Sequence, residues 1–415
     1  MSTTRVFNDM LNEYLPIDLL KGEFLKRDYI LNKVEKQDGW LGGNLIVPFK
    51  GAQASSLEFG GLTSESDIAE YDYVRGQLTS QPEVWASLKF NHSDLMKHGK
   101  VSEQSFLRML PDQIDEMMDY FKMHISVHLL KGPHFAVVTV DGTAGGALGV
   151  DKIDLFELGQ KVVLLDGNTA QANYYVTAIN VNTSVITLSA TRGGAAADIS
   201  AYTVAQGAKV YQPGVLVGGV ATNNMTALSS SLLSAANGGA AALYGVTKLS
   251  YPHTQAVNVD GSSITASNIL DKIFDAYTTV RSKARGNADT ILLSYKHLGS
   301  IMKLIETQKG PFKTTPNTMK ASEYGWTEIE ITSVKGTLKI VGIQEMPDDL
   351  IYFVDWKGLK FFSDGMFKVR QSPDGNKFYE VRATSGYSYI VDICLFGDLV
   401  VHKPSNHGVI YGISY

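Results

Sequence analysis

Two histidines have a spacing that could bind a metal ion. His124 and His128 lie four residues apart in a stretch with helical periodicity, which places both imidazoles on one face of a helix. Zinc requires at least one further protein ligand, and His134 is the nearest that could supply it. No cysteine or carboxylate cluster accompanies these residues. We therefore predict no metal site and interpret the pair as structural or as part of an interface.

Three other groups contain residue types that catalyse reactions in enzymes. Two acidic groups could act as general acid and base. The third group has the Ser-x-x-Lys spacing of penicillin-recognising serine enzymes, but the companion motifs of those enzymes are absent. One acidic group lies in a predicted turn, and the other has the negative charge favoured at the start of a helix. We therefore predict no catalytic residue among Asp348 and Asp349, among Asp115, Glu116 and Asp119, or in the pair Ser300 and Lys303.

The remaining motifs for chemistry are also incomplete. Gly99 and Lys100 are followed by Val101, so they do not form a phosphate-binding loop, and no dinucleotide-binding glycine pattern follows a strand. Cys394, the only cysteine, lies in an apolar stretch and is typical of a small buried hydrophobic residue. We predict that the protein is not an enzyme and binds no cofactor.

The composition favours a globular protein that assembles in a reducing cytoplasm. Of the 415 residues, 44% are hydrophobic and 19% are charged, which is enough to bury a core. The net charge of −5 argues against a protein that grips nucleic acid electrostatically. One cysteine rules out a disulfide within the chain. The start of the sequence lacks the pattern of a secretory signal, and no apolar run is long enough for a membrane helix.

The first 95 residues predict an arm followed by an extended β-structure. Residues 1–38 are too polar to form a core, whereas residues 39–95 show strand patterns punctuated by glycines. In the stretch 83–90, alternate residues point to opposite faces. Strands that carry aromatic residues and have no helix to cover them require a partner surface. The residues that we predict to contribute to such an interface are Trp40, Phe49, Phe59, Tyr73 and Trp85.

The central part of the chain predicts a long helix and then an inserted β-domain. A helix with one apolar stripe is expected from Pro111 to Leu130, preceded by a separate short helix over 102–110. In residues 134–214 turn signals recur about every ten residues, which predicts a small all-β barrel or sandwich. The segment 218–245 is rich in small residues, and we interpret it as a linker or a loop-rich turn-back.

The last third of the chain predicts helices followed by strands. An amphipathic helix is expected over 265–285, then a buried strand at 290–293 and a helix capped by Ser294. Strands follow, including a hairpin that pairs 366–370 with 378–382 across a Pro-Asp-Gly turn. The predicted fold class is α+β, with one all-β insertion.

The order of these elements resembles the major capsid protein of tailed bacteriophages, which has the Hong Kong 97 capsid fold. Four stretches carry the resemblance. Residues 85–95 with the helix that follows resemble the start of the spine helix of that family. Residues 287–305 and 340–359 resemble strands and a helix of its axial domain. Residues 381–411 resemble the last strands of its peripheral domain.

The resemblance implies a division of the chain into the parts of a capsid subunit. These are an N-terminal arm (1–38), an extended β-hairpin loop (39–95), a spine helix region (96–133), the inserted β-barrel or sandwich (134–214), an axial domain with part of the peripheral domain (215–380), and terminal peripheral-domain strands (381–415).

The resemblance also implies a function and partners. The subunit is expected to assemble with itself into hexamers and pentamers of an icosahedral head that encloses double-stranded DNA without sequence-specific binding. Portal and scaffolding proteins are implied partners, decoration proteins are further candidates, and no membrane is involved. Assembly would occur in the bacterial cytoplasm, and the product would be the virion shell. Some relatives join subunits through a lysine–asparagine bond, but nothing around Lys50 marks it for that role.

Two other functions remain open at this point. An encapsulin-type nanocompartment could use the same fold to enclose enzymes, and bound cargo protein in place of DNA would distinguish it. A glycan-binding or hydrolytic β-rich protein belongs to a different class, and a convergent pair of acids in a cleft would support it.

Overall fold

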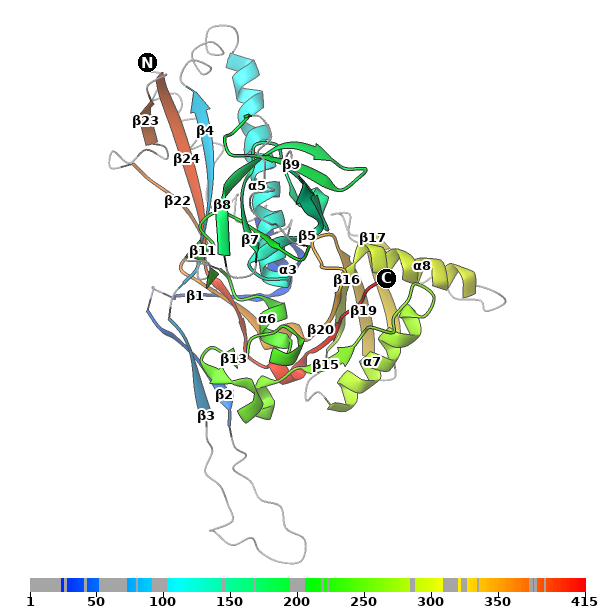
Figure 1. Cartoon of the computed structure of the whole chain (residues 1–415). Coiled ribbons are helices and arrows are strands. Elements are labelled where there is room, and N and C mark those ends of the chain that lie inside the picture. The colour runs from blue at the N-terminus through cyan, green and yellow to red at the C-terminus, as the bar shows by residue number, and fades with distance from the viewer. Residues whose placement is uncertain are drawn as a thin grey trace, which may run out of the picture. The chain divides into compact units, whose positions relative to one another are not determined.

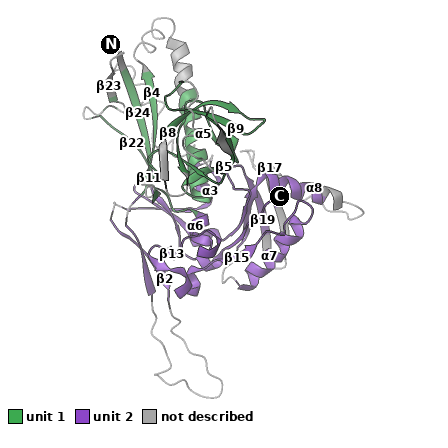
Figure 2. Cartoon of the chain, viewed as in Figure 1, with its two compact units in different colours: residues 1–24, 82–227, 367–396 green, residues 25–81, 228–366, 397–415 purple. Residues whose placement is uncertain are grey.

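A computed structural model describes most of the chain as two compact units (Figure 1, Figure 2). Unit 1 comprises residues 1–24, 82–227 and 367–396, and unit 2 comprises residues 25–81, 228–366 and 397–415. The boundary at residues 81 and 82 falls inside the predicted 39–95 hairpin. The residues that the structure describes are 24–25, 28–40, 43–51, 73–79, 81–91, 103–143, 146–166, 169–194, 206–217, 220–221, 224–283, 288–308, 320–321, 327–333, 336–372, 376, 379–383 and 386–415.

Unit 2 is built on a seven-stranded mixed sheet. The central strand β16 pairs parallel with β19 and antiparallel with β20. Every residue of β16 and of β20 is buried, as expected of strands that are covered on both faces. In spatial order the strands are β15 (Val257–Asp260), β26 (Gly408–Tyr411), β20 (Leu350–Val354), β16 (Thr290–Ser294), β19 (Gly336–Ile343), β18 (Thr327–Ser333) and β17 (Lys320–Ala321).

Two amphipathic helices, α7 (Ile269–Lys283) and α8 (Tyr295–Gln308), share a hydrophobic core with this sheet (Figure 1). Most of the apolar stripe predicted for the first helix is buried on α7, but Leu270 is half-buried and Phe274 is exposed. Ser294 does not cap α8 as predicted, because it ends β16 and its hydroxyl is buried without a hydrogen-bond partner. None of the helices in the described residues is long and apolar enough to cross a membrane.

The rest of unit 2 includes a second sheet and a two-stranded ribbon. In the sheet, β21 (Leu359–Ser363) pairs parallel with β1 (Glu35–Asp38) and antiparallel with β25 (Asp398–Val401). The ribbon consists of β2 (Leu45–Lys50) and β3 (Tyr73–Leu78), which pair antiparallel over their whole length. The helix α3 (Tyr29–Lys33) begins with Asp28, whose carboxylate accepts a hydrogen bond from the amide of Leu31. The short 3₁₀ turns η6 (Trp356–Gly358) and η7 (Pro404–Asn406) complete this part.

The part of the 218–245 segment that lies in unit 2 is packed, so the prediction of a linker is wrong there, and the segment is a turn-back of short elements joined by loops. It contains α6 (Leu228–Leu232), η3 (Ala235–Asn237) and β13 (Ala242–Leu243), and it continues into β14 (Val246–Thr247), η4 (Lys248–Ser250) and η5 (Pro252–Thr254). Leu228, Leu232 and Leu243 are buried. The ammonium of the buried Lys248 donates to the carbonyls of Ser230 and Leu233, and burial lowers the pKa of Lys248 to about 8. The small residues of this segment are typical of linkers, so its composition did not indicate that the segment contributes to the core.

The long helix of unit 1, α5, is one helix from Glu103 to Leu130. The prediction that Pro111 separates two helices is wrong, because α5 continues through the proline. A proline inside a helix removes one backbone hydrogen bond at a cost of about 3 kcal/mol. The predicted stripe is buried, from Ile114 through Phe121 to Leu129. Burial of this stripe outweighs the local cost of the proline.

The strand β24 (Gly386–Phe396) is the centre of the unit 1 sheet. One edge pairs with β4 (Glu83–Asn91) along Ser388–Phe396. A strand has only two edges, so β22 (Phe367–Val369) and β23 (Tyr379–Ala383) must lie one after the other along the second edge, where both pair with β24. The predicted hairpin between them is therefore wrong. Both strands satisfy their backbone hydrogen bonds on β24, which is long enough to pair with the two of them in succession.

The predicted all-β insertion is a closed six-stranded barrel. Around the barrel the order is β10 (Lys209–Tyr211), β5 (His134–Thr143), β6 (Ala147–Val150), β9 (Val185–Ser189), β8 (Thr169–Asn180) and β7 (Lys161–Asp166). Closure leaves no unpaired edge. The barrel core includes Phe135, Leu164 and Ile186, and two residues of α5, Met123 and Val127, pack against it. Between and after these strands lie η2 (Ile153–Leu155) and the pair β11 (Leu216–Val217) and β12 (Val220–Ala221).

A fragment of residues 134–214 is expected to fold by itself, because a closed barrel needs no partner for its edges. A longer fragment that begins at Asp112 should be more stable by about 1–2 kcal/mol, because it buries Met123 and Val127. Circular dichroism and urea unfolding test both statements. Replacing both residues by alanine in the longer fragment should lower its midpoint toward that of the shorter one. A disordered spectrum for 134–214, or equal midpoints for the two fragments, contradicts the prediction.

Candidate assembly surfaces

The β2–β3 ribbon has one packed face and one exposed face. The register pairs Val47 with Gly76 and Phe49 with Val74, so these residues share a face. That face is in the core of unit 2, where Val47 and Phe49 pack with Leu243, Tyr244 and Val400. Phe49 is only 2% exposed, so this predicted interface residue is used inside the chain.

The outward face of the ribbon, formed by Ile46, Pro48, Lys50, Tyr73, Arg75 and Gln77, carries apolar groups in solvent. Ile46 and Tyr73 are both 56% exposed, so more than half of each side chain's surface is open to solvent. The charged residues of this face, Lys50 and Arg75, are both basic. An apolar surface bordered by charges of one sign is typical of a protein interface. Tyr73 was predicted to contribute to an interface and Ile46 was not.

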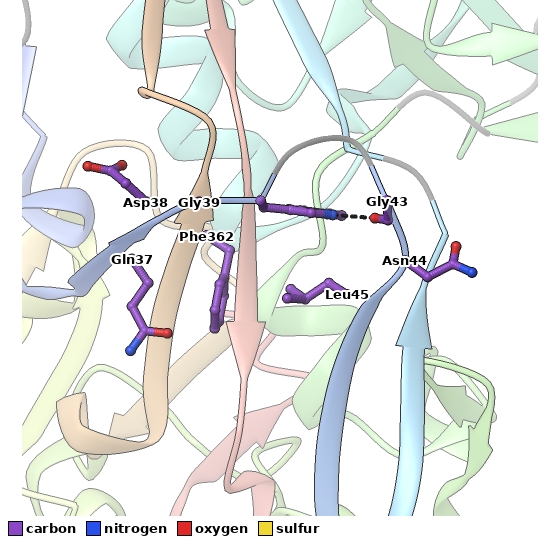
Figure 3. A pocket seen from close by; sticks show the side chains of 8 residues that line it. Gln37, Asp38, Gly39, Gly43, Asn44, Leu45 and Phe362 are labelled. Carbon is purple, nitrogen blue, oxygen red and sulfur yellow. Dashed lines mark hydrogen bonds between the residues drawn. The ribbon is translucent and has the colours of Figure 1, made fainter.

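Trp40 lies at the base of the ribbon and is buried, with 5% of its surface exposed. Its indole nitrogen donates to the carbonyl of Gly43 at 2.5 Å, the dashed line in Figure 3. Beside it is a hollow of about 500 Å³ lined by Gln37, Asp38, Gly39, Trp40, Gly43, Asn44, Leu45 and Phe362.

This hollow lacks the groups needed for hydrolysis. Asp38 is the only ionisable residue in its lining, and one of its carboxylate oxygens accepts a hydrogen bond from the hydroxyl of Ser363 at 2.8 Å. A glycosidase requires two opposed carboxyl groups. The lining can therefore bind by shape and by amide hydrogen bonds, but it offers no acid–base pair.

The unit 1 sheet has a second partly apolar surface on its outward face, formed by β4, β24, β22 and β23. Along β4 the side chains alternate as predicted, with Trp85, Ser87 and Lys89 exposed and the residues between them half-buried. Trp85 is 48% exposed, and its ring packs edge-on against Phe396 at 6.1 Å. Its indole nitrogen donates to the carboxylate of Glu83 at 3.2 Å. These contacts hold a large aromatic side chain in a fixed orientation at the surface.

Polar pairs fix the centre of this outward face. Asp392 accepts a hydrogen bond from the hydroxyl of Ser87 at 2.6 Å and forms an ion pair with Arg370 at 3.5 Å. Arg370 also stacks on the ring of Tyr379. Cys394 lies opposite Trp85 but is buried, and burial together with the carboxylate of Glu83 raises the pKa of its thiol to about 12. A thiol that stays protonated is a poor nucleophile.

The three histidines singled out in the sequence lie where α5 meets the barrel. His124 packs edge-on against Tyr120 and Phe135, and the amide nitrogen of Gln212 lies 2.9 Å from its Nδ1. Burial lowers the pKa of His124 to about 3 and of His128 to about 4. Burial and nearby lysines lower that of His134 to about 3. We interpret these neutral, buried imidazoles as part of the packing between α5 and the barrel. The described residues contain no group of three or more side chains that could hold a metal ion.

The other candidates for chemistry are separated and engaged in local contacts. Asp115, Glu116 and Asp119 are exposed on α5. The carbonyl of Asp348 lies 2.6 Å from a ring nitrogen of His297. The hydroxyl of Ser300 donates to the carbonyl of Lys296 one turn earlier in α8. None of these groups converges with another around the described hollow, and Phe59 lies outside the described residues.

Comparison with known proteins places the similarity among shell proteins. No family model and no curated protein matches the sequence. A cyanophage A-1(L) capsid chain is 12% identical, with 92% of this chain and 91% of that chain covered and a TM-score of 0.49. The capsid of a native GTA particle is 11% identical, with 92% and 90% covered and a TM-score of 0.44. The SrpI encapsulin of Synechococcus elongatus PCC 7942 is 8% identical, with 93% and 88% covered and a TM-score of 0.40.

Proposed function

We propose that this chain is the major capsid protein of a tailed bacteriophage, which assembles into hexamers and pentamers of an icosahedral head around double-stranded DNA. The observation that carries the proposal is the β2–β3 ribbon. One of its faces belongs to the core of unit 2, and the other presents Ile46 and Tyr73 to solvent. The resemblance of the sequence to capsid proteins supports the same assignment.

The ribbon is suited to docking by its outward face and not by its edge. Adding a strand to an edge requires a continuous row of free backbone donors. Pro48, in the middle of β2, has no N–H group and interrupts that row. The amide of Gln77 on β3 is already bonded to the carbonyl of Tyr244. A neighbouring copy would therefore contact side chains of the outward face.

The outward face of the unit 1 sheet offers the second contact. Trp85 is a large aromatic group with a polar tip, the kind of residue that is enriched at the centre of interfaces. Stable interfaces of this class bury roughly 2,000–5,000 Å². Modest contacts repeated around closed rings are sufficient for a durable shell.

The net charge and the chemistry of the described residues fit a container. A net charge of −5 would keep packed DNA from adhering to the subunit. The polar groups described above are used in structural hydrogen bonds and ion pairs, which supports a structural role in the virion. Portal, scaffolding and decoration proteins are the further partners of such a shell, and assembly would take place in the cytoplasm of the host bacterium.

Electron microscopy of the purified protein, with size-exclusion chromatography, tests the proposal. We expect closed polyhedral shells or separate hexamers and pentamers. Tyr73→Asp should reduce shells at least tenfold without unfolding the chain, because it places a charge in the outward face of the ribbon. Val181→Asp, at an apolar position of the barrel that is 70% exposed, is the control and should still assemble. A wild-type protein that stays monomeric across salt and concentration contradicts the proposal.

The contents of the shells decide between a phage head and a nanocompartment. Particles isolated from infected or producing cells should contain double-stranded DNA. Particles that contain a bound cargo protein and no DNA would favour the encapsulin alternative.

A further inference from the structure

The turn that joins β13 and β14 contains an unfavourable residue. Leu243 pairs with Val246, so the loop has two residues, Tyr244 and Gly245. Both have positive φ, 51° and 82°, as in the hairpin turn that favours Asn-Gly. A bulky residue at the first position is a conformational outlier. An outlier that persists in a small turn indicates that its side chain is needed at that place.

The side chain of Tyr244 makes two kinds of contact inside unit 2. Its ring stacks on Phe49 of β2, with 6.0 Å between ring centroids and an angle of 8°. Its hydroxyl accepts a hydrogen bond from the amide of Val401 at 2.9 Å and donates to the carbonyl of Leu399 at 3.5 Å, both in β25. Burial and the nearby Asp398 raise the pKa of Tyr244 well above its usual value, so the hydroxyl remains a donor.

The backbone of Tyr244 holds the other strand of the ribbon. Its carbonyl accepts a hydrogen bond from the amide of Gln77 in β3 at 2.8 Å. Next to Gln77, a Cβ on Gly76 would lie 2.8 Å from the ring of Phe49 and 3.0 Å from the Cβ of Tyr244. Only glycine permits this close approach. One residue thus connects both strands of the ribbon to β25.

We propose that Tyr244 is a positioning residue that fixes the direction of the β2–β3 ribbon relative to β25 and thereby sets the curvature of the shell. This inference rests on the proposed function and extends it. If the outward face of the ribbon docks on a neighbouring copy, the direction of the ribbon determines the angle between copies. A ribbon held within a narrow range of directions restricts the angles between copies, and with them the range of shell sizes.

Tyr244→Asn tests the proposal, because asparagine is favoured in this turn but lacks the ring and the hydroxyl. In the unassembled protein, hydrogen exchange at the amide of Gln77 should become about tenfold faster. Assembled Tyr244→Asn should give shells of several diameters where the wild type gives one. Tyr244→Phe keeps the stacked ring and should give shells of one diameter. Its hydrogen-exchange rate at the amide of Gln77 should lie between the rates of the wild type and of Tyr244→Asn. Ser184→Asn is the matched control, since Ser184 also has a positive φ, of 52°, in a turn of the barrel.

Two results would overturn the inference. Tyr244→Asn shells with the single diameter of the wild type would show that the residue does not set curvature. Ser184→Asn shells with an equal spread of diameters would show that any turn substitution has this effect. A wild-type protein that forms no shell would instead refute the proposed function, while hydrogen exchange at Gln77 would still decide whether Tyr244 anchors the ribbon.

Discussion

Replacing Gly408 by alanine is expected to lower the free energy of unfolding of unit 2 by about 3 kcal/mol. Gly408 begins β26, where α7 crosses close to the sheet. A Cβ at this position would lie 2.3 Å from a methyl carbon of Val280, a fully buried residue of α7. Valine has few alternative rotamers in a helix, so the helix itself would have to move. Urea or thermal unfolding of the full chain measures the loss.

Two further variants show that the clash causes the loss. Gly299→Ala, in the helix α8, meets no atom within 4 Å and should stabilise the protein by about 0.5–1 kcal/mol. Val280→Ala is destabilising in the wild type because it leaves a cavity. Combined with Gly408→Ala it should cost less than the sum of the two single changes, because the new methyl group fills that cavity. Strict additivity of the two changes would contradict this account.

Acid is expected to destabilise unit 1 through the three histidines at the joint between α5 and the barrel. Burial lowers the pKa values of His124, His128 and His134 from about 6.5 to between about 3 and 4. The unfolded chain therefore binds more protons than the folded chain between these values. Stability is complete above about pH 6.5 and falls as the pH decreases toward 4. Three such groups give a slope of at most about 4 kcal/mol per pH unit.

The charges around this joint cannot compensate for protonated imidazoles. Lys131 and Lys209 are basic, and both oppose protonation of His134. The carboxylate of Asp151 forms an ion pair with Lys131 at 3.1 Å. Protonation would therefore add positive charge to a buried site.

Urea unfolding between pH 7.5 and pH 5 measures the effect. His128→Gln keeps a polar side chain but cannot take up a proton, so it should reduce the slope of stability against pH by about a third. Equal slopes for the wild type and His128→Gln would show that the joint does not sense acid.

The patterns along single elements predicted much of the fold. The alternation in 83–90 placed Trp85 on the outward face of a strand, where the structure has it. The period of the apolar residues gave the buried stripes of α5 and α7, and the turn spacing gave the barrel. These patterns are reliable because a helix or strand that buries one face has apolar residues at its own structural period.

The candidate interface could be predicted only in part. In β2 both alternating sets are apolar, Leu45, Val47 and Phe49 on one face and Ile46 and Pro48 on the other. Alternation alone cannot decide which face is packed. The decision depends on Tyr244, almost two hundred residues later, which stacks on Phe49 and leaves Ile46 and Tyr73 exposed. Trp40 and Phe49 were predicted as interface residues because they are aromatic residues on predicted strands. Both are buried within the single chain.

The sequence by itself determined the class of the fold, the barrel and the two-faced strands, because these follow from local periods and turn chemistry. Only the tertiary structure decided the contacts between distant segments. The strands β22 and β23 pair with β24 and not with each other. The helix α5 continues through Pro111 because its apolar stripe is buried. Tyr244 adopts a positive φ because its side chain packs in the core of unit 2. Each of these outcomes depends on which distant surface can bury more area and satisfy more backbone hydrogen bonds, a comparison that no single segment contains.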